Sequence, residues 1–249
     1  MILVARLAGP LASYGTGSRF GTRATDTVPS LSALVGLCAS SLGRPRGEDL
    51  SDLASLPMAV RVDTPGSVVR DYHTVNAPDP DRYWFLSEPD RRRLFTIPTG
   101  DSTPDAPKRW DVKGTTTQIT ERDYLSGAAF TWFVDLGELD PLGLAAALDA
   151  PHWQPYLGRK ACTPTFPFVL GTRDGTITDA AATVPVLAPG EGSVRCELHC
   201  WNLEVPTGRE LWRSDLPTRT GHTEQRRVVT HVEAPRVPDI ATLLDAVGP

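Results

Sequence analysis

Apolar residues fall into short runs along the chain, and their spacing predicts alternating strands and helices. Residues 1–8 form an apolar run with Arg6 as its one charge, which is typical of a buried strand. Over residues 29–42 apolar side chains recur on one helical face, and serines at the start supply an N-cap. We therefore expect a helix that Ser30 or Ser32 caps. Gly36 lowers helix propensity within it, so we expect close packing against a strand there.

Further strands follow at intervals, separated by one second helix and one long insertion. Residues 59–63 alternate as a strand, and residues 68–75 are placed to pair back as a hairpin. A second helix is expected from Asp140, which would act as its cap, with Pro141 in its first turn. The other predicted strands are residues 128–136, 166–171, 194–205 and 227–233.

The order strand, helix, strand, strand, helix, strand is the βαββαβ pattern of a ferredoxin-like (RRM-like) domain, an α+β fold. Residues 76–120, rich in Pro, Asp, Arg and Thr, interrupt the pattern and are expected to be an insertion. The predicted organisation is thus a core made of residues 1–75 and 121–172, an insertion of residues 76–120, and a smaller β-rich part, residues 173–249, packed on the core.

Composition limits the classes of partner. The 249 residues carry a formal net charge of −5 with a pI near 5.5, which argues against a free-standing nucleic-acid binder with a dominant basic face. A local basic groove remains compatible, because phosphate contacts depend on where the charges lie. With no long apolar run and no signal peptide, we expect a cytoplasmic protein with no membrane segment and four reduced cysteines.

Basic residues gather in the segment that surrounds the start of the first helix. Residues 14–46 hold four arginines against the single acid Asp26, in an otherwise acidic protein. Arg19 and Arg23 lie just before the helix, whose free amides attract phosphate and whose neighbouring guanidinium groups can bind it in a bidentate manner. The alternative is a solvated surface loop.

Two further motifs are candidates for contacts with RNA. In residues 70–75, strand alternation puts Tyr72 and His73 on opposite faces. His73 can transfer a proton at a ribose hydroxyl, stack on an unpaired base, or simply satisfy Asp71. In residues 156–162, a glycine precedes Arg159 and Lys160, and these two cations either reach phosphates or occupy a turn after the second helix.

Metal and cofactor sites are not predicted. Cys196, His199 and Cys200 invite a zinc interpretation, but in a strand the two cysteines face one side and the histidine the other. Two buried thiols are the expected arrangement. The chain has no phosphate-binding Gly-Lys-Ser/Thr loop, no Gly-x-Ser-x-Gly elbow and no paired-histidine metal motif.

Five short motifs taken in order resemble one family. They are Arg-Leu-Ala-Gly-Pro-Leu at residues 6–11, Gly-Thr-Arg at 21–23, Pro-Ser-Leu-Ser-Ala-Leu-Val-Gly-Leu at 29–37, Arg-Asp-Tyr-His-Thr-Val at 70–75, and Tyr-Leu-Gly-Arg-Lys-Ala-Cys at 156–162. Together they resemble CasD, a family within the RAMP superfamily of CRISPR RNA-binding proteins and a subunit of the type I-E surveillance complex Cascade.

The resemblance implies an RNA-binding core without catalytic activity and without a cofactor. Such a subunit grips the 5′ handle of the guide crRNA, caps the filament of Cascade backbone subunits, and contacts the Cascade large subunit. Target DNA is reached only through the complex. The insertion would be a β-hairpin thumb that kinks the guide, with Arg122 at its returning edge. The RNA-binding residues implied by the motifs and the resemblance are Tyr14, Arg19, Thr22, Arg23, Ser30, Ser32, His73, Arg122, Arg159 and Lys160.

An alternative function is a metal-independent endoribonuclease that processes CRISPR repeat RNA, as relatives in type I-C systems do. Its candidate catalytic residues would be Tyr14 or Tyr72, together with His73 and Lys160. Such cleavage needs a base and a cation around one 2′-hydroxyl, so these side chains would have to lie together in the fold.

Overall fold

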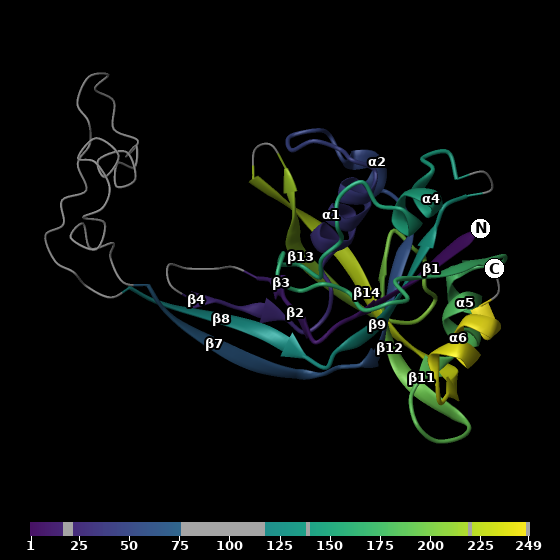
Figure 1. The fold of residues 1–249 in the computed structure, drawn as a ribbon. Helices are drawn as coiled ribbons and strands as arrows, with labels where there is room; N and C mark the ends of the chain where they lie inside the picture. Colours follow the sequence, from purple (N-terminus) through teal and green to yellow (C-terminus); the bar gives the residue numbers. More distant parts are fainter. Residues whose placement is uncertain (17–21, 76–117, 138–139, 219–220, 248–249) are drawn as a thin grey trace, which may run out of the picture.

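A twisted eight-stranded sheet forms the body of the protein (Figure 1). The computed structural model describes residues 1–16, 22–75, 118–137, 140–218 and 221–247. In sheet order the strands are β10 (Val169–Arg173), β1 (Ile2–Ala8), β9 (Ala129–Asp135), β6 (Met58–Thr64), β12 (Ser193–Trp201), β14 (Gly221–Val237) and β11 (Val186–Leu187), and β13 (Arg209–Thr218) pairs with β14. Every pairing between them is antiparallel except that of β11 with β14.

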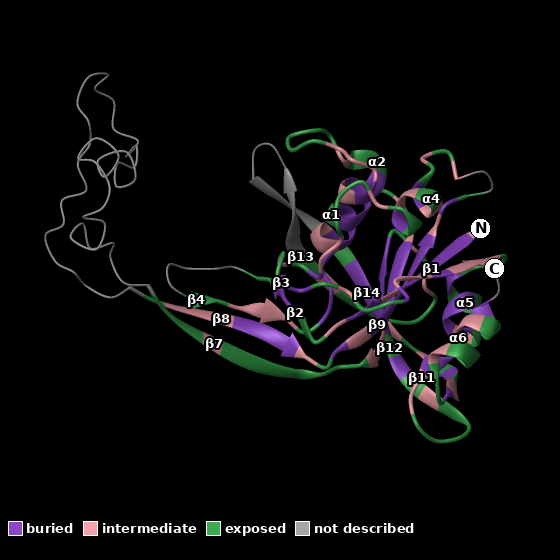
Figure 2. Cartoon of the chain, in the orientation of Figure 1, coloured by how far each residue is buried: buried purple, intermediate pink, exposed green. Residues whose placement is uncertain are grey.

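Helices cover both faces of this sheet. On one face lie α1 (Leu31–Ser41), α2 (Ser51–Ala54) and α4 (Leu144–Asp149), and on the other lie α5 (Ile177–Thr183) and α6 (Ile240–Val247) (Figure 1). Successive side chains of β1 point to opposite faces of the sheet and so contribute to two cores. Leu3 and Leu7 lie in the core under α1, and Ile2 and Val4 lie in the core under α5 and α6. The sheet is therefore buried on both sides (Figure 2), which explains why every residue of β1 except Arg6 is apolar.

A separate ribbon projects from one end of the sheet. β8 (Gln118–Ser126) pairs with β7 (Ser67–Val75), with the short β2 (Leu11–Ala12) and with the short β4 (Thr22–Arg23), while β3 (Tyr14–Gly15) pairs with β5 (Thr25–Asp26). Figure 2 shows most of β7 exposed, whereas the part of β8 nearest the body is buried. The ribbon thus carries backbone and side chains well away from the body of the protein.

A buried arginine connects the sheet to the second helical layer. Arg61 on β6 has no exposed surface and makes an ion pair with Asp63 at 2.6 Å. Its other nitrogens donate to the carbonyls of Ala181, Val184 and Pro185, around the end of α5, at 2.5 to 3.0 Å. A buried charge is tolerated only when it is paired and hydrogen-bonded in this way.

Most predicted elements are confirmed, and the exceptions have physical reasons. The first helix ends at Ser41, as expected, and the Ser30 hydroxyl accepts a hydrogen bond from the Ala33 amide at 3.3 Å. The expectation for Gly36 is wrong, because the residue is exposed and an added Cβ would meet no atom within 4 Å. The second helix begins only at Leu144, although the Asp140 carboxylate still accepts amides of its first turn.

The α+β class predicted from the sequence is confirmed, but the C-terminal part differs from the expectation. β12 pairs directly with β6, so residues 173–249 extend the central sheet, and they also contain α5 and α6, which the sequence analysis missed. Apart from its last residues, which form the start of β8, the predicted insertion of residues 76–120 lies outside the described residues. No helix in the described part of the chain is both long and apolar enough to cross a membrane.

Candidate nucleic-acid interface

Two of the predicted arginines come together along the middle of the projecting ribbon (Figure 1). β4 and β8 run parallel, and their register sets Thr22 beside Glu121 and Arg23 beside Arg122. Neighbouring strands lie about 4.8 Å apart, and side chains in register point to the same face. Arg23 and Arg122, which are about 100 positions apart in the sequence, therefore form one adjacent pair of cations.

The turn at residues 156–162 adds a third cation to this pair. Gly158 adopts a positive φ of 85°, and a Cβ there would lie only 1.8 Å from the carbonyl oxygen of Ser13. The Ser13 amide donates to the Leu157 carbonyl at 3.0 Å, which fixes the turn against the segment that precedes β3. Only glycine permits such a close approach of the two backbones. The contact with Ser13 in turn sets the backbone position of the next residue, Arg159.

Arg159 lies directly on the ribbon. Its guanidinium carbon is 4.7 Å from the centre of the Tyr124 ring, and its Nη2 donates to the carbonyl of Arg23 at 3.2 Å. Tyr124 shares a face of β8 with Arg122 through strand alternation. We name Arg23, Arg122 and Arg159 the arginine cluster. Sequence reasoning selected all three cations but missed Tyr124, whose signal was its position two residues after Arg122.

The carboxylates of the ribbon pair with residues outside the arginine cluster, although Asp71 lies opposite Arg122 in the register of β7 and β8. On the opposite face of the ribbon Arg70 binds Asp123 at 2.8 Å and Glu121 at 3.2 Å. The Asp71 carboxylate contacts Nε2 of His73, an ion pair when the imidazole is protonated. Within the described residues, no carboxylate forms an ion pair with a member of the arginine cluster.

Two nitrogens of the arginine cluster are buried without a partner. Nε of Arg122 and Nη1 of Arg159 have no hydrogen-bond partner in the part of the chain that the structure describes. An unsatisfied buried donor is costly, and a charged donor more so, because it has lost its water. The described residues thus do not fully satisfy the cations of the arginine cluster, and a phosphodiester is the kind of anion that arginine side chains bind.

The remaining predicted site residues are placed in different ways. Thr22 is exposed beside the arginine cluster, and Lys160, which follows Arg159, is exposed as well. The Ser30 hydroxyl accepts a hydrogen bond from the Ala33 amide and lies 3.0 Å from the hydroxyl of the partly buried Ser32. Ser30 therefore acts as the N-cap of α1. Arg19 lies outside the described residues.

The expected RNA contact of Tyr14 is not supported by its position. Its side chain is 1% exposed and packs edge-on against Phe130, with ring centres 6.1 Å apart. Burial raises the pKa of the phenol far above its usual value, with a smaller contribution from Cys162. Tyr14 therefore belongs to the core, where alternation in a two-residue strand could not have revealed its direction.

His73 lies on the same face of the ribbon as Arg122. It pairs in register with Thr120, and Asp71 pairs with Arg122, so the two residues of the predicted His–Asp pair flank the arginine cluster on that face. Tyr72 points to the other face and is 57% exposed. The alternation predicted for residues 70–75 is confirmed by this register.

The cysteines fit the expectation of buried thiols. Cys196 and Cys200 on β12 are both buried and unbonded to one another, and burial raises the pKa of Cys200 to about 12. Nε2 of His199 donates a hydrogen bond to the Glu197 carboxylate at 3.2 Å. Among the described residues no group of three or more potential ligands is arranged to hold a metal ion.

Comparison with known proteins identifies the family. The model of the family described as CRISPR-associated protein (Cas_Cas5) matches residues 2–237, which is nearly the whole chain. The chain belongs to the Cas5 family. It is 32% identical over 187 residues to the CRISPR system Cascade subunit CasD of Escherichia coli (strain K12), covering 68% of this chain and 70% of that protein. The resemblance to CasD seen in the sequence is thereby confirmed.

Solved structures agree with this assignment along the full length of the Cas5 chain. One described as a CRISPR RNA-guided surveillance complex superposes with a TM-score of 0.73 at 30% identity, covering 99% of both chains. Another, described as the crystal structure of a Cas protein, gives a TM-score of 0.58 at 29% identity and covers 96% of this chain and 99% of the other. The similarity therefore includes the C-terminal strands and helices as well as the motif-bearing half.

Proposed function

We propose that this protein is a subunit of a type I-E Cascade complex that binds the 5′ handle of the guide crRNA and has no catalytic activity. The observation that carries the proposal is the arginine cluster, with its two buried and unpartnered donors. The similarity to CasD and to a surveillance-complex chain supports the same partners. These are the crRNA handle, the backbone subunits and the large subunit, with target DNA reached through the complex in the cytoplasm.

The finer structural assignments belong to this proposal. Strands β10, β1, β9 and β6 lie side by side with α1 and α4 on one face, in the order that a ferredoxin-like, RAMP-type βαββαβ unit requires. The ribbon β7–β8 would be the base of the thumb, since residues 76–117 connect its strands. The arginine cluster would then grip the handle backbone where the thumb leaves the core.

The endoribonuclease alternative receives less support. Tyr14 is buried, and the burial that raises the pKa of its phenol opposes a role as a base. Tyr72 and His73 project from opposite faces of β7, so they do not meet around one 2′-hydroxyl. We therefore propose that this chain binds guide RNA and does not cut it.

The test is guide retention in the purified complex. The double variant Arg23→Ala, Arg122→Ala should lose most of the bound crRNA, while Arg195→Ala, which removes an exposed arginine of β12, should retain it. In direct binding, each lost phosphate contact should lower the slope of log K against log salt by about one. A double variant that holds the guide at the wild-type yield would refute the proposal, and cleavage of repeat RNA that His73→Ala abolishes would establish the alternative.

A further inference from the structure

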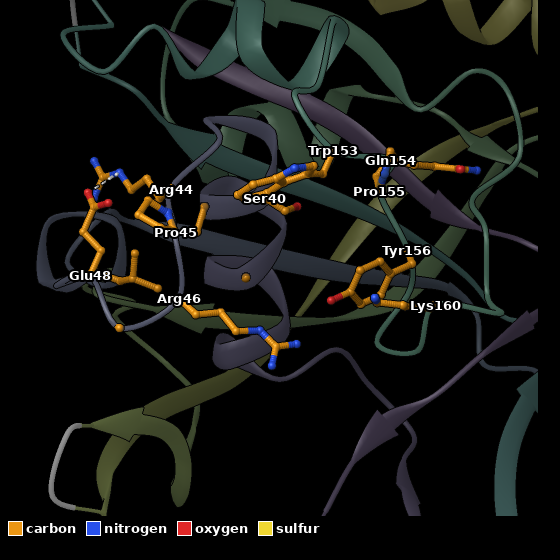
Figure 3. Close-up of a pocket in the computed structure, with 14 residues that line it drawn as sticks. Ser40, Arg44, Pro45, Arg46, Glu48, Trp153, Gln154, Pro155, Tyr156 and Lys160 are labelled. Atoms are coloured by element: carbon orange, nitrogen blue, oxygen red, sulfur yellow. Dashed lines mark ion pairs between the residues drawn. The ribbon is translucent and has the colours of Figure 1, made fainter. Parts of the chain in front are cut away.

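A groove crosses the outer face of α1, on the side of the helix that faces away from the sheet. Its volume is about 840 Å³, within the range of roughly 300–1,000 Å³ that small-molecule and cofactor sites occupy. The loop after α1 (residues 44–50) lies on one side of the helix and residues 153–160 lie on the other (Figure 3).

The floor of the groove is bare because the outer face of α1 carries small side chains. Gly36 and Ser40 lie one helical turn apart along it, and a Cβ at position 36 would meet nothing within 4 Å. A glycine in the middle of a helix destabilises it relative to alanine. The missing side chain therefore leaves space that packing within the chain does not use.

One wall is aromatic and is held in place by the helix end. Trp153 remains 46% exposed, yet its amide donates to the Ser40 carbonyl at 3.3 Å and the His152 amide donates to the Ser41 carbonyl at 2.9 Å. The His152 ring meets the indole edge-on, with ring centres 4.9 Å apart. These contacts fix the indole beside the groove before any ligand arrives.

The charge left in the groove is positive. Arg44 is neutralised by Asp52 and by Glu48, with the Glu48 pair at 3.7 Å. Arg46 and Lys160 also line the groove, and neither forms an ion pair with a carboxylate within the described ranges. In Figure 3 the Tyr156 ring and Lys160 lie on the same side of α1 as Trp153, further along the groove, and the Arg46 side chain extends toward them from the loop on the other side.

We propose that this groove binds one unpaired nucleotide of the guide RNA, with its base against Trp153 and its phosphate between Arg46 and Lys160. Indole rings stack on every base, and cations close to a stacking surface are the usual arrangement for single-stranded RNA. Lys160 directly follows Arg159, so the groove begins where the arginine cluster ends and one RNA strand can occupy both. This inference rests on the proposed function and adds a second contact site to it.

Gly36→Leu is the sharpest test, because it fills the groove and favours the helix. Leucine has the higher helix propensity and the position has open space, so the variant should be no less stable than the wild type. We expect affinity of the full chain for an oligoribonucleotide that copies the host repeat's 5′ handle to fall about tenfold or more, while Gly36→Ala, which adds one methyl group, binds as the wild type does.

Side-chain variants separate stacking from charge. Trp153→Ala should lower affinity about tenfold without changing the salt dependence, whereas Arg46→Ala and Lys160→Ala should each lower the salt slope by about one. Trp212→Ala is the control, because Trp212 is 59% exposed on β13 and lies outside the groove. AMP, tested as the free-nucleotide source, should not compete at millimolar concentration.

The outcomes distinguish this inference from the proposed function. If the wild type binds the RNA and both Gly36→Leu and Trp153→Ala bind equally well, the groove proposal is wrong while the arginine cluster stands. AMP binding that Gly36→Leu abolishes, with RNA binding unchanged, would overturn the guide as the source in favour of a free nucleotide. A wild-type chain that binds no handle RNA would overturn both proposals.

Discussion

Gly158→Ala should damage the protein far more than a glycine-to-alanine change normally does. The added methyl would require the left-handed backbone conformation at φ +85°, which costs an L-residue about 1–2 kcal/mol. It would also lie 1.8 Å from the Ser13 carbonyl oxygen, nearer than any real Cβ contact. The turn would have to retreat by more than about 1 Å from the segment before β3.

That retreat removes a hydrogen bond as well as adding strain. The backbone bond from the Ser13 amide to the Leu157 carbonyl, now 3.0 Å long, contributes about 1 kcal/mol. With the conformational cost, the total loss is about 2–3 kcal/mol in the free energy of unfolding. The same movement displaces Arg159 from Tyr124 and Arg23, so guide retention should fall along with stability.

Gly127→Ala provides the matched control. Gly127 has a positive φ of 67°, but a Cβ there would meet no atom within 4 Å, so this variant incurs the conformational cost alone. Because both variants carry the conformational cost, they differ by the lost hydrogen bond of about 1 kcal/mol. For a urea slope of roughly 2–3 kcal/mol/M, the midpoint of Gly158→Ala should fall about 0.3–0.5 M further than that of Gly127→Ala. Equal midpoints for the two variants would refute the argument that contact with Ser13 holds the turn in place.

Three further predictions concern stability. Arg61→Met should lower the free energy of unfolding by about 3–5 kcal/mol in urea titrations, because it leaves the Asp63 carboxylate without its ion-pair partner. Adding Asp63→Leu should recover part of that loss, and no recovery would contradict the argument. Burial, and then the charge of Arg227, lower the pKa of His199 from 6.5 to about 4. The unfolded chain therefore takes up this proton first, so the free energy of unfolding is highest above pH 6.5 and falls as the pH drops toward 4, by up to about 1.4 kcal/mol per pH unit. In His199→Gln that slope should be shallower, and an unchanged pH profile would rule out this histidine as its source. Ser30→Ala should cost about 1 kcal/mol by removing the cap of α1, measured as a lower Tm; an unchanged Tm would show that the cap contributes little.

The elements that were predicted correctly from the sequence are those that local patterns determine. The apolar run of β1, the capped helix α1 and the alternation of residues 70–75 each depend on neighbours within a few positions, which is the range over which propensity and periodicity act. The C-terminal helices were missed because they are short and cover a sheet face whose existence depends on the pairing of β12 with β6. That pairing joins residues about 140 positions apart, and no local signal encodes it.

The candidate site divides in the same way. The sequence by itself supplied the candidate residues for RNA contact, since basic side chains beside a helix start and after a glycine can be read from the chain. Only the tertiary structure decided that Arg23, Arg122 and Arg159 meet, that Tyr14 is buried, and that Gly36 faces open space. The physical reason is that charge and side-chain chemistry belong to single residues, whereas proximity and burial are set by the register of strands distant in sequence.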